Sequence, residues 1–190
     1  MTLRRGFRAE AERTASAIRG ELGLAEHDPL PLDDAAGTHD VKVVSAGDLI
    51  DIERLEDLER LQSFSFSACT FDVLGSTVIV FNPLRSVPRQ RSDIAHEFSH
   101  LLLGHELTEI REVAGVPFRT CRSEQEEEAT ALGGTLLLPR KLLIRAAAKG
   151  LGIDEVARKF DVTVEMARFR FNTTGVTRQI NRARAGRTAT

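Results

Sequence analysis

Two histidines four residues apart, with a glutamate directly after the first, are the side chains of this sequence best placed to do chemistry. His96, Glu97 and His100 form the pattern H-E-x-x-H within IAHEFSHLLLGH, a segment predicted to be helical as far as Gly104. Residues i and i+4 lie on one helical face, so both imidazoles can bind one metal ion while Glu97 reaches a water molecule beside it. The pattern predicts a zinc site at which Glu97 takes a proton from a water attacking a peptide carbonyl and passes it to the departing amine.

The same five letters also recur by chance, so their surroundings matter. The predicted helix begins near Ser92 or Asp93 and is otherwise apolar around the motif. Burying two histidines and a glutamate in such a helix costs several kcal/mol unless they are paired or bind metal. We therefore favour a metal site, with Zn²⁺ as the expected ion and Mn²⁺ as the alternative.

A catalytic zinc ion needs a third protein ligand and an open position. His105 lies nine residues after His96, with Gly104 before it, whereas the metzincin pattern places the glycine seven and the histidine ten residues after the first ligand. The mismatch of one step at both places argues against His105 as a ligand. We expect His105 to lie at the helix end or behind a ligand.

The third ligand is expected in SEQEEEATALGGTLLLP, a predicted helix that runs from Ser123 to about Leu138. Ser123 and Glu126 match the S-x-x-E capping box. In that motif the carboxylate of Glu126 accepts from the backbone of the cap residue, so we do not expect Glu126 to bind the metal. Glu128 shares the register of the inward-facing apolar residues that follow it, so Glu128 is the predicted ligand and Glu124, one turn earlier, is the alternative.

Residues 133 and 134 of the same helix are both glycine, which weakens a helix. A close approach to the H-E-x-x-H helix would explain the pair.

The chain contains neither tyrosine nor tryptophan. A tyrosine hydroxyl therefore cannot stabilise the tetrahedral oxyanion of peptide hydrolysis. The metal ion, His105, Arg89 or Arg91 must do so, and the sequence does not choose among them.

The composition is that of a folded protein outside membranes. Apolar residues make up 42% of the 190 residues, and no apolar run approaches the roughly 20 residues of a membrane span. Residues 1–24 lack the features of a secretory signal and are predicted to form an amphipathic helix. Cys69 and Cys121 form no CxxC pair and no disulfide framework. We expect a soluble, cytoplasmic protein, whose oligomeric state stays open with a monomer favoured.

Further elements follow from the local pattern. Prolines and aspartates in residues 27–40 predict an irregular, turn-rich segment. A short strand is expected at 41–49, a charged helix at 50–62, and a hairpin at 65–82 that turns at Leu74-Gly75-Ser76. A loop is expected to pass through Gly115 and Pro117.

Several segments together resemble the ImmA/IrrE family of bacterial metallopeptidases. They are RGFRAEAERTASAIRGELGL, FSACTF, VIVFNP, RQRSDIAHEFSHLLLGH, EEATALGGTLLLP and FDVTVEMARFRFNTTGV, which cover most of the chain in order. The sequence departs from the family in having Thr130 where asparagine is common, and Leu132-Gly133 in place of a typical Phe-Ala. These look like packing changes that leave the ligands intact.

The resemblance implies an α+β fold: a compact zincin-like domain, a small antiparallel sheet beside the active-site helix, and a helix-turn-helix-like end. It assigns the metal ligands to His96, His100 and Glu128, and the general base to Glu97. It also implies a function in transcription regulation, in which this metalloendopeptidase cleaves a helix-turn-helix (XRE-type) repressor and relieves repression. We expect the peptidase domain at 1–149 and the helical segment at 150–190.

The C-terminal pair of helices leaves other functions open. The net charge of the chain is −2, but the segment from Lys159 to the end contains seven basic residues and only two acidic ones. Arg168 and Arg170 lie on the second helix, which in a DNA-binding protein would enter the major groove. The apolar residues of the pair favour packing or recognition of the protein substrate, so we expect no direct DNA binding. The alternatives are a DNA-binding regulator with a peptidase-like sensor and a toxin–antitoxin-type partner-binding protein.

Overall fold

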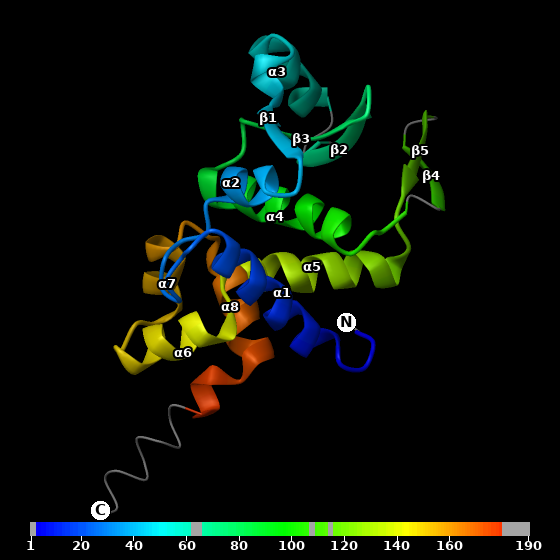
Figure 1. Cartoon of the computed structure of the whole chain (residues 1–190). Helices are drawn as coiled ribbons and strands as arrows, with labels where there is room; N and C mark the ends of the chain where they lie inside the picture. Colours follow the sequence, from blue (N-terminus) through cyan, green and yellow to red (C-terminus); the bar gives the residue numbers. More distant parts are fainter. Residues whose placement is uncertain (1–2, 62–65, 107–108, 114–115, 180–190) are drawn as a thin grey trace, which may run out of the picture.

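Two helices, α4 (Val87–Leu102) and α5 (Ser123–Leu137), lie side by side at the centre of the molecule, and the other elements are arranged around them (Figure 1). The computed structural model describes residues 3–61, 66–106, 109–113 and 116–179. The elements follow one another as α1 (Phe7–Glu21), α2 (Leu32–Gly37), β1 (Val41–Ser45), η1 (Ala46–Asp48), α3 (Ile52–Leu61), β2 (Ala68–Val73), β3 (Ser76–Phe81), α4, β4 (Glu109–Val113), β5 (Val116–Thr120), α5, α6 (Arg140–Ala148), α7 (Ile153–Lys159) and α8 (Val164–Thr174).

A three-stranded sheet in the order β1-β3-β2 covers one side of α4. The predicted hairpin is confirmed: β2 and β3 pair antiparallel, and Leu74 and Gly75 turn between them with positive φ angles of 54° and 79°. Positive φ at both central residues suits the right-handed twist of a hairpin. The expectation of an antiparallel sheet is wrong, because β1 pairs parallel with β3. The chain between them, through α3 and β2, is long enough to bring β3 back in the direction of β1.

Three other local predictions are corrected. Residues 32–37 form α2 although prolines precede them, because a proline just before a helix gives up no intrahelical hydrogen bond. Helix α4 begins at Val87, before Ser92 and Asp93, since Pro88 fits in a first helical turn. The expected loop around Pro117 is an antiparallel hairpin of β4 and β5, which projects beyond the central helices in Figure 1. Gly115 lies outside the described residues.

The side of α5 that faces away from the sheet is covered by α1 (Figure 1). α1, α2, α4, α5 and the later helices share one large hydrophobic cluster. Among the described residues, no helix combines the length and the apolar character that spanning a lipid bilayer requires.

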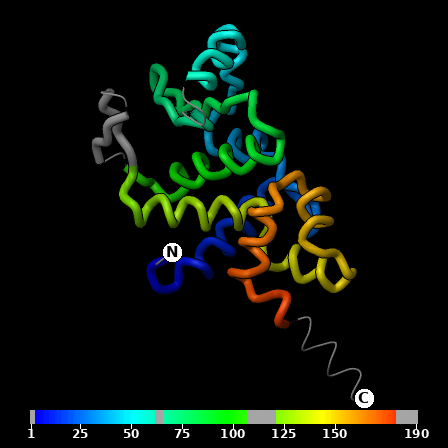
Figure 2. The backbone as a smooth tube through the Cα atoms, turned by 180° about the vertical axis from the view of Figure 1, so that it is seen from behind, coloured from blue at the N-terminus to red at the C-terminus, as the bar shows by residue number. Residues whose placement is uncertain are grey.

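Helix α8 lies against the end of α5, and α7 packs against α8 (Figure 2). Val156 of α7 and Phe171 of α8 belong to the same cluster as Phe98 of α4. The pair therefore adds to the core around the central helices. Its similarity to a helix-turn-helix unit stays a prediction, as does the division into 1–149 and 150–190.

Arg170 cannot act as a DNA contact in this structure. It is 5% exposed, and its guanidinium donates from Nε to the carbonyl oxygen of Leu138 at 3.0 Å and from Nη2 to Glu12 Oε1 at 2.7 Å. It thus joins α8 to α1 and to the end of α5. Arg168 is exposed, and Arg182, Arg184 and Arg187 lie outside the described residues.

We predict that Arg170→Ala destabilises the protein by roughly 3 kcal/mol, because it removes the charged partner of Glu12 and the guanidinium donor of the Leu138 carbonyl. Among the described residues, Glu12 then keeps only the backbone N–H of Arg140 as a donor. Arg168→Ala, on the exposed side of the same helix, should change stability by less than about 0.5 kcal/mol. Unfolding by urea, followed by circular dichroism, measures both. Equal stabilities of the two variants would contradict the structural role of Arg170.

Candidate metal centre

The two motif histidines turn the same ring nitrogen toward each other on one face of α4. His96 Nε2 and His100 Nε2 are 3.1 Å apart. One helical turn separates the residues, as the i, i+4 spacing requires. The structure therefore brings the two predicted ligands together.

A third donor comes from α5, and it belongs to Glu126. Its Oε2 lies 3.1 Å from His96 Nε2 and 3.6 Å from His100 Nε2. These three residues form a group whose donor atoms all lie within 4.8 Å of one another. Two segments that are 30 residues apart in the sequence thus converge on one point.

The spacing of the three donors suits a bound metal ion. Tetrahedral zinc with ligand bonds of about 2.0–2.1 Å places its ligand atoms about 3.3 Å apart. The separations here, 3.1 to 3.6 Å, bracket that value. Two neutral imidazole nitrogens and one carboxylate oxygen are also ligands that zinc accepts. The residues present therefore fit a metal ion.

The carboxyl group of Glu126 is stabilised in its ionised form. Its pKa is lowered, chiefly by the nearby imidazoles of His100 and His96 and despite partial burial. An ionised carboxylate is the form that a metal ligand needs. The electrostatics of the cluster therefore agree with its geometry.

Glu97 lies next to this cluster and has a different environment. Burial raises its pKa, while a hydrogen bond from Thr70 and the nearby His96 and His100 lower it. Thr70 Oγ1, on β2, donates to Glu97 Oε2 at 2.8 Å. A carboxylate with a raised pKa is a stronger proton acceptor, as a general base requires.

Two cavities adjoin Glu97. The larger, of about 510 Å³, extends along β2 and is lined by His96, Glu97, His100 and Glu126. The smaller, of about 340 Å³, also contains His96 and Glu97 and reaches Met166 at the start of α8. The larger cavity runs along the edge of the sheet, because β2 is an edge strand.

The structure places the predicted third ligand, Glu128, in another set of contacts. Glu128 Oε2 lies 3.4 Å from His105 Nε2 and its Oε1 lies 2.9 Å from Arg4 Nε. His105 in turn contacts the ring of His100. The side chain of Glu124 is exposed in the first turn of α5.

The two arginines proposed as oxyanion partners lie on different sides of α4. Arg89 lines the smaller cavity and pairs with Asp93 at 2.9 Å. Arg91 donates to the carbonyl oxygen of Leu30 at 2.9 Å. Of these two, Arg89 is the one beside Glu97.

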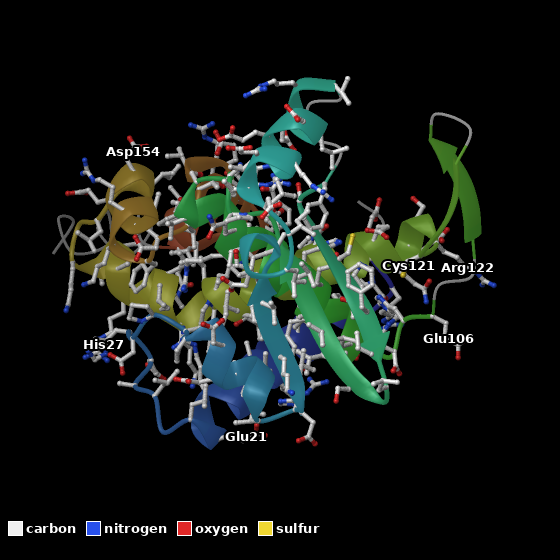
Figure 3. The ribbon with its side chains drawn as sticks, turned by 90° about the horizontal axis from the view of Figure 1, so that it is seen from above. Glu21, His27, Glu106, Cys121, Arg122 and Asp154 are labelled. Atoms are coloured by element: carbon white, nitrogen blue, oxygen red, sulfur yellow. The ribbon has the colours of Figure 1, made fainter. Side chains whose placement is uncertain are left out.

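Sequence reasoning missed Glu126 because it assigned that residue to the helix cap. The cap lies one residue earlier: the backbone N–H of Arg122 donates to Gln125 Oε1 at 3.1 Å. Glu126 is therefore free to face α4. Cys121 and Arg122, labelled in Figure 3, mark where the chain enters α5.

A signal for Glu126 was present in the paired glycines. A Cβ atom at Gly133 would lie 3.1 Å from the carbonyl carbon and oxygen of Ala95 and 3.2 Å from the backbone nitrogen of His96. The expected close approach to α4 is thus confirmed at Gly133. Counting back from Gly133 by one turn and then another gives Thr130 and Glu126, which share its face. Thr130 Oγ1 lies 3.5 Å from His96 Nδ1.

Gly134, the next residue, faces α8. A Cβ there would lie 2.9 Å from the sulfur of Met166 and 3.1 Å from Cδ of Arg170, so it allows α8 to approach α5.

Comparisons with known proteins point to a metallopeptidase family. Residues 56–172 match the family model Peptidase_M78, described as the IrrE N-terminal-like domain. No curated protein matches the sequence significantly. Among solved structures, a transcriptional regulator of Mycobacterium tuberculosis superposes with a TM-score of 0.57 at 15% identity, over 86% of this chain and 46% of that one. At that identity the similarity concerns the fold alone, and this chain spans less than half of that regulator.

We predict that Gly133→Ala destabilises the protein by roughly 1–2 kcal/mol, because backbone atoms of α4 must move to admit the methyl group. It should also weaken metal binding, since Glu126 moves away from His96. Gly134→Ala meets side-chain atoms of Met166 and Arg170 and no backbone atom, and it gains helix propensity, so it should cost less than Gly133→Ala. Unfolding midpoints and metal titrations of both variants measure this. A Gly133→Ala variant with parental stability and metal affinity would refute the close-contact argument.

Proposed function

Because the chain belongs to the ImmA/IrrE family of metallopeptidases, we propose that it is a zinc-dependent endopeptidase that cleaves a helix-turn-helix (XRE-type) repressor and so relieves repression. The observation that carries the proposal is the convergence of His96, His100 and Glu126 beside the partly buried Glu97. Such a group does the chemistry of metal-assisted peptide hydrolysis.

The metal would be held by His96, His100 and Glu126, with Glu126 in the place that the sequence analysis gave to Glu128. Bound there, zinc would polarise the scissile carbonyl group and make the attacking water more acidic. The donor set has two imidazoles and one carboxylate, which leaves a fourth position open. Mn²⁺ is the alternative ion.

Glu97 is the proton carrier of the reaction. Thr70 engages Oε2 of its carboxylate, which leaves Oε1 to accept the proton of the attacking water. The same oxygen then gives the proton to the departing amine nitrogen. Thr70 thereby fixes the orientation of Glu97 relative to the substrate.

Arg89 is our candidate for stabilising the oxyanion. His105 also borders the larger cavity, but its side chain is only 6% exposed and both ring nitrogens contact protein groups. Arg89 is half exposed and lines the cavity beside Glu97. A cationic donor at that place can offset the negative charge that develops during attack.

We expect a protein substrate, because the larger cavity runs along the edge strand β2. An edge strand offers unpaired backbone groups to which an extended polypeptide can bind. The burial of Arg170 argues against a DNA-binding regulator. The presence of Glu97 beside the cluster argues against a partner-binding protein without catalysis. We expect the enzyme to act in the cytoplasm as a monomer.

The decisive experiment incubates the purified protein, with zinc or manganese, together with a repressor encoded by a neighbouring gene. Mass spectrometry of the products should find one cut in the repressor that depends on the metal. An intact repressor under all metal conditions would overturn the proposed substrate.

We predict that Glu97→Gln retains metal binding and loses cleavage by at least about 100-fold, because an amide cannot accept the proton of water. Isothermal titration with zinc and product analysis by mass spectrometry separate the two effects. A Glu97→Gln variant that cleaves at the parental rate would rule out Glu97 as the general base.

We predict that Glu126→Ala loses more metal affinity than the roughly 10–100-fold typical of removing a group behind a ligand. Glu124→Ala changes an exposed carboxylate on the same helix and should bind metal like the parent. Titration of the metal-free proteins with zinc measures both. Parental affinity in Glu126→Ala would exclude Glu126 from the ligand set.

A further inference from the structure

A chain of buried contacts continues behind His100, away from the metal centre. His100 Nδ1 lies 3.0 Å from His105 Nδ1, and His105 Nε2 lies 3.4 Å from Glu128 Oε2. The side chain of His105 is 6% exposed and that of Glu128 is 15% exposed. Neither group belongs to the cluster of three donors, and both are shielded from competing water.

Local backbone geometry brings His105 to this place. Gly104 has a φ of +63°, a left-handed conformation that favours glycine at the end of a helix. The backbone N–H of His105 then donates to the carbonyl oxygen of His100 at 3.0 Å. The chain thus folds back so that the ring of His105 lies 5.1 Å from that of His100.

Glu128 is itself held in position. Its second oxygen, Oε1, pairs at 2.9 Å with Nε of Arg4, in the segment before α1. Arg4 also pairs with Glu10 of α1 at 2.7 Å. The carboxylate therefore has one oxygen directed toward Arg4 and one toward His105.

These contacts define which nitrogen of each ring carries the proton. A carboxylate accepts hydrogen bonds, so Glu128 selects the His105 form with its proton on Nε2. The Nδ1 of His105 is then an acceptor, and the contact at 3.0 Å requires the proton of His100 to be on Nδ1. The Nε2 of His100 is left with its lone pair directed toward His96 and Glu126, as a metal ligand needs.

A second contact of His100 Nδ1 would favour the opposite tautomer of that ring. Cys121 Sγ lies 3.3 Å from the same His100 Nδ1. A thiol donating to Nδ1 would move the proton of His100 to Nε2 and block its lone pair. A ring nitrogen is a better acceptor than a thiol sulfur. The hydrogen bond from His100 Nδ1–H to His105 Nδ1 is therefore favoured over one from the thiol of Cys121 to His100 Nδ1.

We propose that His105 and Glu128 form a positioning relay that holds His100 in the tautomer with a free Nε2, with Arg4 anchoring the far end. The relay rests on the proposed function only in that His100 is taken as a metal ligand. It gives Glu128, which has the inward register expected of a ligand, a place one step behind the metal centre. His105 and Glu128 are positioning residues because they act through His100.

The test compares His105→Phe with His105→Asn. Phenylalanine fills the buried space without an acceptor, whereas the Oδ1 of asparagine can accept from His100 Nδ1–H. We expect His105→Phe to weaken zinc binding by roughly 10–100-fold, the usual effect of losing such a partner. His105→Asn should recover most of that loss. Titration of the metal-free proteins with zinc gives these affinities.

The direct readout is the tautomer of His100 in the metal-free protein, from nitrogen-15 NMR of the imidazole rings. The parent should have the proton on Nδ1, and His105→Phe should shift it toward Nε2. A proton on Nε2 in the parent, or parental zinc affinity in His105→Phe, would overturn the relay. Recovery of the Nδ1 tautomer in His105→Asn separates the loss of the acceptor from a general loss of packing.

A second pair of variants decides the matter if His105→Phe does not fold. Glu128→Gln keeps an acceptor oxygen for His105 and should retain the His100 tautomer, whereas Glu128→Leu should lose it. Glu124→Gln, an exposed change on the same helix, is the control and should match the parent. Equal tautomers in both Glu128 variants would also overturn the relay.

These measurements use no peptide substrate. A parent protein with the expected tautomer and zinc affinity that nevertheless cleaves no repressor would refute the proposed function and leave the relay standing.

Discussion

The close approach of α4 and α5 is the contact on which the rest of the structure depends. At Gly133 no side chain separates the two backbones, and a Cβ atom would come within 3.1 Å of Ala95. Because the helices lie so near each other, a short carboxylate on α5 reaches the imidazoles of α4. The sheet and α1 cover the outer sides of this helix pair. The polar cluster lies between the two helices, near the start of α5.

Polar groups at this place would destabilise the protein if they were left unpaired. The structure instead gives each of them a partner. Glu97 accepts from Thr70, His96 lies near Thr130, and His100 contacts His105. Burying ionisable groups is tolerable when such contacts compensate for lost hydration. The same contacts orient the side chains, so stability and preorganisation of the site have one physical origin.

The C-terminal helices contribute to the site through packing. Arg170 bonds to α1 and to the end of α5, while Met166 borders the smaller cavity beside His96 and Glu97. Gly134 makes room for α8 in the way that Gly133 makes room for α4. Two adjacent glycines on one helix thus set two interhelical contacts, because successive residues of a helix point about 100° apart.

The sequence by itself determined the features that depend on neighbouring residues. The spacing of His96 and His100, the hairpin at Leu74-Gly75, and the close approach at Gly133 follow from helical periodicity, turn chemistry and the absence of a side chain. The tertiary structure decided which glutamate meets the histidines and that β1 pairs parallel with β3. It also decided that Arg170 is buried. Neighbouring residues of a helix point about 100° apart, so Glu126 and Glu128 face different partners. The sequence around Ser123 and Gln125 allows either of two caps, and only one of them leaves Glu126 available to face α4. The choice of Glu126 over Glu128 therefore depends on how α5 packs against α4, and that packing is a property of the whole fold.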